Sequence, residues 1–225
     1  MAGVKRVHAV VLGAAVVGGI AVFYVTSGGA AIVPTGPIPQ AEVDAAASFP
    51  GYVEGADAAP VEVIEFADFQ CPACKQAWVL TVQDVKQRLV PTGQVKYTFR
   101  DFPLSGHPFA RQAHHAAACA AEQDLFWQMH DQLFLNQEEW SFFRGAPENK
   151  FLEYATAVGA NVPAYETCMA EGRYRARIQA SVELGVTNGV TGTPSFVIGG
   201  RLYQSMAYDQ LKAIVDSIAA SQAGE

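Results

Sequence analysis

The sequence contains little positive charge. Of its 225 residues, 15 are lysine or arginine and 22 are aspartate or glutamate, so the formal net charge is −7. Lys5 and Arg6 are the only charged residues among the first 30, which leaves the rest of the chain still more acidic. An acidic surface repels nucleic-acid phosphates, so the composition argues against nucleic-acid binding.

Patterns that bind metals or phosphates are also scarce. The chain has a single Cys-x-x-Cys and no His-x-x-x-His, so no set of four zinc ligands is complete. His114 and His115 precede Cys119, but histidines in such a helix are more often ordinary surface or core residues. The "GVTG" stretch is too short and wrongly placed for a phosphate-binding loop. We therefore expect neither a metal ion nor a cofactor.

What the sequence does contain is typical of a folded, exported protein. Half of the residues are apolar and 16% are charged, which predicts one main globular domain. Residues 1–30 are predicted as a membrane anchor or signal peptide, 31–60 as a linker or arm rich in Gly, Pro and Ala, and 61–220 as the domain.

The N-terminal segment predicts export. Ala9 to Val25 has no charged or strongly polar side chain and spans about 26 Å as a helix, close to the ~30 Å hydrocarbon thickness of a bilayer. A cleaved signal peptide stays open, because Gly28 and Ala30 supply small residues before a possible cleavage site. In both cases the basic residues Lys5 and Arg6 stay on the cytoplasmic side. The downstream domain then lies outside the cytoplasm, in an oxidising compartment.

Four cysteines in such a compartment predict disulfides, and they allow three pairings. Cys71 and Cys74 are too close for their disulfide to remove much entropy from the unfolded chain. The roughly 50-residue loop between Cys119 and Cys168 would contribute about 4 kcal/mol in the same model. We therefore expect a Cys71–Cys74 pair that exchanges electrons and a Cys119–Cys168 disulfide that stabilises the fold.

The apolar pattern predicts a mixed α/β fold. "VEVIEF" predicts a buried strand followed by a helix, and "GQVKYTFRDF" a second strand. Residues 107–188 have helical spacing almost throughout, and "SFVIGGRLYQ" is typical of a hairpin that turns at Gly199 and Gly200. Ser205 is expected to cap a last helix. The apolar stripe of that helix consists of Tyr208, Leu211, Ile214, Val215 and Ile218.

The Cys-x-x-Cys motif follows the first predicted strand and opens the first predicted helix. At a helix N-terminus, free N–H groups and the helix dipole stabilise a thiolate, so Cys71 should have a low pKa and be nucleophilic. Cys74, one turn further on, is placed to resolve a mixed disulfide. Pro72 is tolerated because the first turn needs no N–H from it.

Two more features favour thiol-disulfide exchange. Thr193 and Pro194 stand directly before a strand, where we expect a cis peptide bond and free backbone groups that pair with an extended substrate. Glu65 is an acid within a strand predicted to be buried, six residues before Cys71, and could relay protons to the resolving thiol. A solvated edge carboxylate and an ordinary trans turn are the plainer alternatives.

Taken together, these motifs resemble the DsbA family of thiol-disulfide oxidoreductases. "EFADFQCPACKQ", the helical stretch "HPFARQAHHAAACAAEQDLFWQMHDQLF" and "GVTGTPSFVIGG" occur in the family's order and separation, across about 61–220. The resemblance implies a thioredoxin-like fold with a helical insertion at about 107–188. A second disulfide such as Cys119–Cys168 resembles a subset of the family, notably actinobacterial members.

The resemblance also implies roles for individual residues. Cys71 would be the attacking cysteine, Cys74 the resolving cysteine and Pro194 the cis-proline. Glu65 falls where the family has its buried acid, and Thr193 where a residue tunes redox behaviour. A membrane quinone-linked oxidase of the DsbB or VKOR type would reoxidise the pair.

One departure concerns the dipeptide between the cysteines, which is Pro72-Ala73, whereas well-known members have Pro-His. The lost imidazole predicts a less oxidising pair. The expected function is a monomeric extracytoplasmic oxidase that introduces disulfides into reduced exported proteins. A reductase or isomerase, and a polypeptide-binding module without turnover, remain the alternatives.

Overall fold

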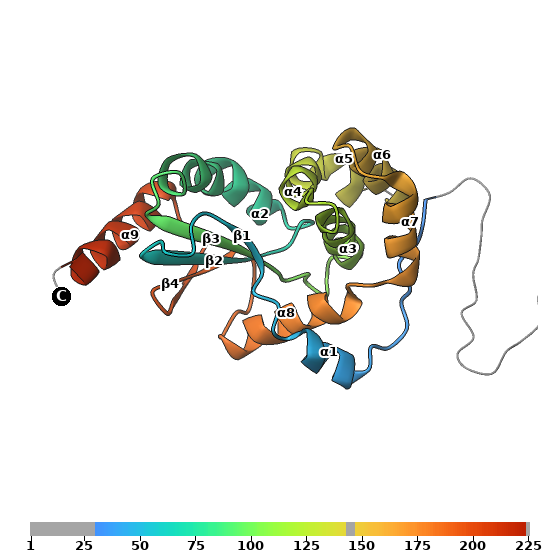
Figure 1. Cartoon of the computed structure of the whole chain (residues 1–225), viewed down its shortest axis with the longest axis horizontal. Helices are drawn as coiled ribbons and strands as arrows, with labels where there is room; N and C mark the ends of the chain where they lie inside the picture. The colour runs from blue at the N-terminus through green and yellow to red at the C-terminus, as the bar shows by residue number, and fades with distance from the viewer. Residues whose placement is uncertain (1–29, 143–146, 224–225) are drawn as a thin grey trace, which may run out of the picture.

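The computed structural model describes residues 30–142 and 147–223 (Figure 1). The predicted membrane segment, Ala9 to Val25, lies outside these residues. In the part of the chain that is described, no helix is both long enough and apolar enough to cross a membrane.

A five-stranded sheet forms the centre of the molecule, with strand order β1-β3-β2-β4-β5. Strands β2 and β3 are parallel, and the other neighbours are antiparallel. The strands are β1 (Tyr52–Glu54), β2 (Val61–Ala67), β3 (Val95–Asp101), β4 (Ser195–Ile198) and β5 (Arg201–Gln204). The central position of β2, with neighbours on both sides, explains why its sequence is apolar with little alternation.

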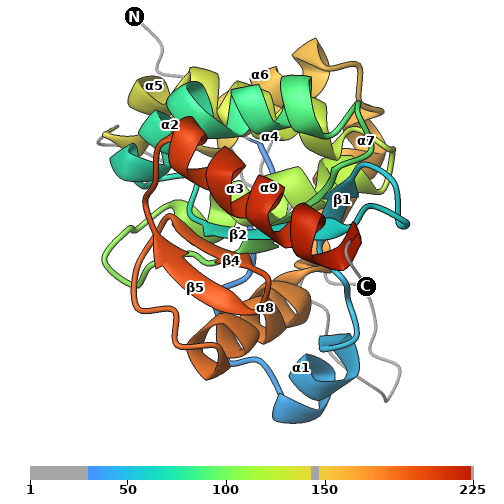
Figure 2. The same ribbon diagram turned by 90° about the vertical axis from the view of Figure 1, so that its left-hand side faces the viewer.

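Helices cover both faces of this sheet (Figures 1 and 2). One face carries α9 (Tyr208–Ala223) and a continuous helical stretch, 72–89, that begins as α2 (Pro72–Ala77). That stretch has wider π-helical turns at η1 (Trp78–Val82) and η2 (Val85–Leu89). The opposite face carries α8 (Arg175–Thr187), whose Gly185 lies so close to Phe102 and Phe66 that a Cβ atom would meet them.

The region predicted as a helical insertion consists of consecutive helices between β3 and β4. After α3 (Ala110–Ala121) come α4 (Phe126–Leu135), α5 (Gln137–Ser141), α6 (Glu148–Ala157) and α7 (Val162–Glu171), followed by α8. In Figure 1 helices α3 to α7 form a group at one end of the sheet. The fold class predicted from the sequence, a thioredoxin-like α/β fold with added helices, is thereby confirmed for the described residues.

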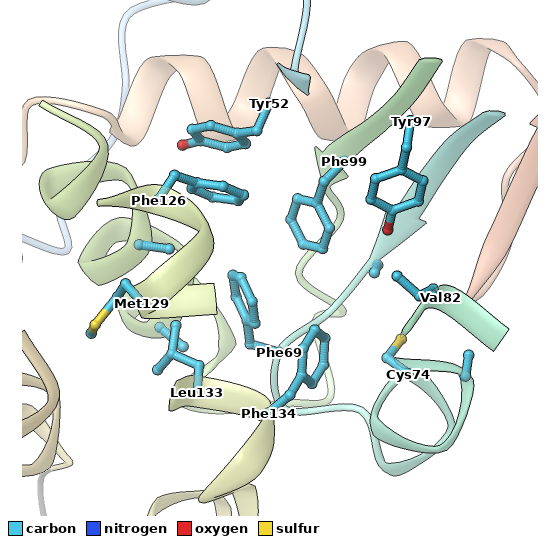
Figure 3. Packing of buried hydrophobic residues seen from close by; sticks show 14 of the residues in the cluster. Tyr52, Phe69, Cys74, Val82, Tyr97, Phe99, Phe126, Met129, Leu133 and Phe134 are labelled. Carbon is cyan, nitrogen blue, oxygen red and sulfur yellow. The ribbon is translucent and has the colours of Figure 1, made fainter. Parts of the chain in front are cut away.

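An aromatic cluster joins the sheet to the added helices (Figure 3). Phe69 lies in the loop before α2, and its ring centroid is 5.2 Å from that of Phe99 on β3 and 5.0 Å from that of Phe134 on α4. Phe126 of α4 also contacts Phe99, at 5.6 Å between centroids. Because Phe69 is fully buried only two residues before Cys71, this cluster holds the loop that leads into the cysteine pair.

The N-terminal arm contains structure that its composition did not predict. Helix α1 (Gln40–Ala46) packs against α8, and β1 extends the sheet beside β3. Val33 and Val43 are buried although their surroundings are rich in Gly, Pro and Ala. Such short elements have too few residues to show a period, so only their tertiary contacts reveal them.

The last helix has the predicted apolar stripe but not the predicted cap. Leu211 and Val215 are fully buried, and Ile214 and Ile218 pack against the same core. The helix begins at Tyr208, so Ser205 is too early to be its N-cap, and that prediction is wrong. The Gln210 side chain instead accepts a hydrogen bond from the backbone N–H just before the first turn.

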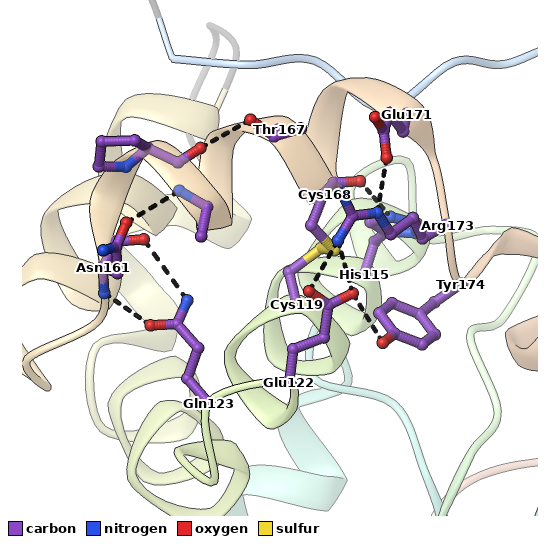
Figure 4. Close-up of polar contacts among 12 residues, drawn as sticks. His115, Cys119, Glu122, Gln123, Asn161, Thr167, Cys168, Glu171, Arg173 and Tyr174 are labelled. Atoms are coloured by element: carbon purple, nitrogen blue, oxygen red, sulfur yellow. Dashed lines mark hydrogen bonds and ion pairs between the residues drawn. A yellow bond between two sulfur atoms is a disulfide. The ribbon is translucent and has the colours of Figure 1, made fainter.

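The Cys119–Cys168 disulfide predicted from the sequence is present and connects α3 to α7 (Figure 4). The two residues are 49 positions apart, their Cα atoms are 5.8 Å apart, and both are fully buried. Arg173 and Glu122 form an ion pair close by, with the Tyr174 hydroxyl donating to the same carboxylate. The disulfide therefore closes the added helices into one unit.

Removal of this disulfide should lower the stability of the fold. We expect Cys119→Ala/Cys168→Ala to reduce the free energy of unfolding by about 4 kcal/mol, because the unfolded chain regains the entropy of a long open loop. Denaturant unfolding monitored by circular dichroism measures the difference. A loss below about 1 kcal/mol, the size of an ordinary point mutation, would contradict a structural role.

Candidate active site

Cys71 is the residue at which the chain turns from an extended loop into α2. Its backbone is extended (φ −75°, ψ 120°), and its carbonyl accepts the first helical hydrogen bonds, from Cys74 and Lys75 at 3.1 and 3.2 Å. Pro72 occupies the first helical position, where its fixed φ suits the helix and no N–H is required. The Cys71 side chain is therefore held at the helix N-terminus, as its position in the sequence predicted.

The environment of the Cys71 sulfur favours the thiolate. Hydrogen bonding lowers the pKa of Cys71 to about 5, first through the Cys74 thiol and then through Thr193 and the backbone of Cys74 and Ala73, although burial acts in the opposite direction. As a thiol, the sulfur instead donates to the Thr193 carbonyl at 3.5 Å.

Cys74 has the opposite environment. It is fully buried, and burial is the main cause that raises its pKa well above the ordinary value, followed by the hydrogen bond with Cys71 and the charges of Cys71 and Glu65. The Asp68 N–H lies 3.4 Å from its sulfur. The two sulfur atoms are not joined by a disulfide in this structure. At neutral pH the pair therefore consists of one thiolate and one protonated thiol.

Thr193 and Pro194 come from a distant part of the chain to face Cys71. The peptide bond between them is cis, and Pro194 directly precedes β4. Ser195 fastens the turn, since its hydroxyl donates to the Gly192 carbonyl at 2.7 Å. The structure thus brings together Cys71, Cys74, Thr193 and Pro194, although Cys71 and Thr193 are 122 positions apart in the sequence.

Glu65 lies in the central strand β2 and is almost completely buried, so it is not a solvated edge carboxylate. Burial raises its pKa to about 7, while a hydrogen bond from the Tyr97 hydroxyl and the charge of Lys86 act in the opposite direction. Figure 3 shows the Tyr97 hydroxyl directed toward the helix that carries Cys74. A carboxyl group that titrates near neutral pH therefore lies within electrostatic range of the Cys74 sulfur.

The loop before Cys71 is fixed by side chains that the sequence did not point to. The fully buried Asp68 accepts hydrogen bonds from the backbone of Gln70 at 2.7 Å and from the ring of His107 at 2.7 Å. Gln137 of α5 donates to the carbonyls of Phe69 and Cys71 at 2.7 and 3.0 Å. These contacts hold the sulfur of Cys71 in place.

No local signal in the sequence identifies these supporting residues. Tyr97 contacts Glu65 only because parallel pairing sets Tyr97 opposite Val63, so that it shares a face of the sheet with Glu65. Gln137 is 66 positions from Cys71 along the chain and approaches it through the packing of α4 and α5. Only a correct strand register and helix packing could have predicted either contact.

His115, Cys119 and Cys168 have potential ligand atoms within 4.8 Å of one another. The two sulfur atoms are bonded to each other, however, so neither is a thiolate ligand. The His115 ring uses Nε2 to donate to the Cys168 carbonyl at 3.4 Å. This cluster is therefore part of the structural disulfide and not a metal centre.

Comparison with known proteins places this geometry in a family. A family model described as Thioredoxin matches residues 48–217. The probable disulfide bond formation protein D of Bacillus anthracis is 27% identical over 169 residues, which cover 72% of this chain and 75% of that protein. The Na(+)/H(+) antiporter NhaA 3 of Salinispora tropica is 38% identical over 151 residues, or 67% of this chain and 22% of that protein. The chain thus spans less than a quarter of the length of this antiporter relative.

Solved structures share the fold. A thioredoxin-like oxidoreductase from Silicibacter pomeroyi superposes with a TM-score of 0.64 at 28% identity, over 79% of this chain and 97% of the other. Wolbachia pipientis alpha-DsbA1 superposes with a TM-score of 0.69 at 18% identity, over 80% and 96%, a likeness of fold alone. The chain belongs to the thioredoxin family, and it is similar to a disulfide bond formation protein and, in fold, to a DsbA protein.

Proposed function

We propose that this protein is an extracytoplasmic oxidase that introduces disulfides into reduced exported proteins through Cys71 and Cys74. The observation that carries the proposal is the asymmetry of the pair, in which the pKa of Cys71 is lowered to about 5 and that of Cys74 is raised. A stabilised thiolate favours the reduced pair, so the disulfide form is a good oxidant.

The reaction consists of two exchanges. A substrate thiolate attacks the Cys71 sulfur of the Cys71–Cys74 disulfide, which forms a mixed disulfide and releases Cys74 as a thiolate that takes up a proton. A second substrate thiolate attacks the substrate sulfur of the mixed disulfide and releases Cys71 as a thiolate. The substrate loses two electrons to form its disulfide, and the enzyme gains them as a thiolate and a thiol.

Glu65 supplies the proton in this scheme. Because burial disfavours a Cys74 thiolate, the leaving sulfur needs a proton as it departs, and the same proton must be removed when Cys74 attacks in the reverse direction. A carboxyl group with a pKa of about 7 is half protonated at neutral pH and serves both steps. Tyr97 acts as a positioning residue that holds the carboxyl group and tunes its pKa.

The cellular setting follows from the chemistry and from the N-terminal sequence. The apolar run from Ala9 to Val25 is assigned as a membrane anchor, with a cleaved signal peptide as the alternative, and both export the domain. Reoxidation of Cys71 and Cys74 is assigned to a membrane quinone-linked oxidase of the DsbB or VKOR type. Thr193 and Pro194 are assigned to substrate binding beside Cys71, where the Thr193 carbonyl lies 3.5 Å from the sulfur.

The first test replaces each cysteine of the pair in turn. We expect Cys71→Ser to abolish the oxidation of a reduced model protein, measured as loss of free thiols, because no sulfur remains for attack. We expect Cys74→Ser to retain disulfide-bonded substrate in a mixed disulfide with Cys71, visible by mass spectrometry under non-reducing conditions, because the resolving thiol is absent.

The matched control is Cys119→Ala/Cys168→Ala, which also removes cysteines but leaves the proposed redox pair intact. The folded fraction of this variant should retain exchange activity. An effect on substrate folding that survives in Cys71→Ser would favour a binding module. A Cys71–Cys74 potential at or below about −270 mV, the value of thioredoxin, would favour a reductase.

The second test follows the pH dependence of Cys74. The rate at which Cys74 resolves a mixed disulfide on Cys71 should rise with pH around 7, as Glu65 ionises and becomes a proton acceptor. Glu65→Gln should slow this step about 100-fold, since general acid–base catalysis is lost. Tyr97→Phe removes a hydrogen bond to the carboxylate, which raises the pKa of Glu65 and moves the midpoint to higher pH.

Rapid-quench kinetics with a glutathione mixed disulfide on Cys71 measures this step. Glu62→Gln is the matched control, because Glu62 lies on the same strand and is exposed. If Glu65→Gln leaves both the rate and its pH dependence unchanged, Glu65 has no part in proton transfer.

A further inference from the structure

A cavity of about 440 Å³ lies between the N-terminal arm and the helices α3 and α8. Its walls come from residues 33–38 of the arm, from α1, from the first turns of α3 and from α8, and the figures show α1 beside α8 (Figures 1 and 2). The volume falls within the range of ~300 to 1,000 Å³ that is usual for small-molecule sites. None of the four residues proposed for redox chemistry and substrate binding, Cys71, Cys74, Thr193 and Pro194, lines it.

Two arginines line this cavity without a carboxylate partner among the described residues. Arg111 donates to the side-chain oxygen of Gln179 at 2.9 Å, and Arg175 donates to the backbone carbonyl of Gly36. Partial desolvation, and next the charge of Arg175, lower the pKa of Arg111, so the two guanidinium groups are near enough to repel each other. An anion between them would relieve this repulsion.

The carboxylate that lines the same cavity is held by amides. Glu183 accepts hydrogen bonds from the side chains of Gln179 and Gln40, at 3.0 and 3.3 Å. Two guanidinium groups and one carboxylate leave a single net positive charge on the lining, because burial lowers the pKa of His115 to about 4 and keeps that ring neutral. This charge suits a monoanion better than a phosphate dianion, which Glu183 would repel.

Buried polar atoms in the lining lack hydrogen-bond partners. His115 is fully buried and lines the cavity, and because its Nε2 donates to a carbonyl, its Nδ1 is an acceptor that no described residue satisfies. The side-chain oxygen of Gln112, one turn earlier on α3, is buried and unpartnered as well. Unsatisfied buried acceptors are costly, and a donor group on a ligand would satisfy them.

Apolar side chains complete the lining. Val33 and Val43 of the arm and Ile178 of α8 are all buried and contribute to the wall. A ligand that fills the cavity must therefore present apolar surface in addition to its charge.

We propose that this cavity binds a small amphipathic organic carboxylate that carries a hydrogen-bond donor. The carboxylate lies between Arg111 and Arg175, the donor faces His115 and Gln112, and the apolar body contacts Val33, Val43 and Ile178. The site is distinct from the redox pair and does not depend on the proposed oxidase activity.

The test titrates the full chain with 3-(4-hydroxyphenyl)propionate, which combines a carboxylate, a ring and a hydroxyl donor, and with its primary amide as the neutral counterpart. Calorimetry gives the affinity, and backbone amide NMR shifts locate the binding. We expect the amide to bind about tenfold more weakly than the carboxylate, and Arg111→Gln and Arg175→Gln each to weaken the carboxylate about tenfold. The NMR shifts should cluster in the arm, α3 and α8.

Arg201→Gln is the matched control, since Arg201 is an exposed arginine outside this lining, and it should leave the affinity unchanged. All three variants should oxidise model thiols as the wild type does, which separates this result from a failure of the proposed function. Equal affinity for acid and amide, unchanged binding in Arg111→Gln and Arg175→Gln, or no binding at millimolar concentration would each overturn the proposal.

Discussion

The placement of the Cys71 sulfur at the N-terminus of α2, in surroundings that lower its pKa, is the constraint on which the proposed chemistry depends. This placement holds only while the chain enters the helix at Cys71, with Pro72 at the first helical position. Gln137 and Asp68 fix the preceding loop, and the Phe69 ring is clamped between β3 and α4. The added helices therefore do more than cover the sheet, because they hold the loop that positions the sulfur.

The pKa values of Cys71 and Cys74 differ because the two side chains differ in burial and in the charges and hydrogen bonds around them. Cys71 is 6% exposed and hydrogen bonding lowers its pKa, whereas Cys74 is completely buried and lies close enough to Glu65 for the carboxylate charge to raise its pKa. The same burial that protects Cys74 raises the pKa of Glu65 into the neutral range. The same buried region thus contains the Cys74 thiol, whose pKa is raised, and the Glu65 carboxyl group that is proposed to exchange protons with it.

The sequence predicted those features that depend on local order. The position of Cys71 at a strand-to-helix junction, the burial of Glu65 in a central strand and the pairing of Cys119 with Cys168 follow from short motifs, apolar period and loop length. The contacts of Tyr97 and Gln137 depend on strand register and helix packing, which no local pattern encodes. Helix α1 was missed because the arm has no sustained period.

The most direct test of this account is the ionisation of the Cys71 thiol in the reduced protein. Ultraviolet absorbance of the thiolate, followed against pH and compared with Cys71→Ser, isolates this group. The account predicts a midpoint near pH 5, together with rapid alkylation at neutral pH. A midpoint near the ordinary value of a free cysteine, with slow alkylation, would contradict it.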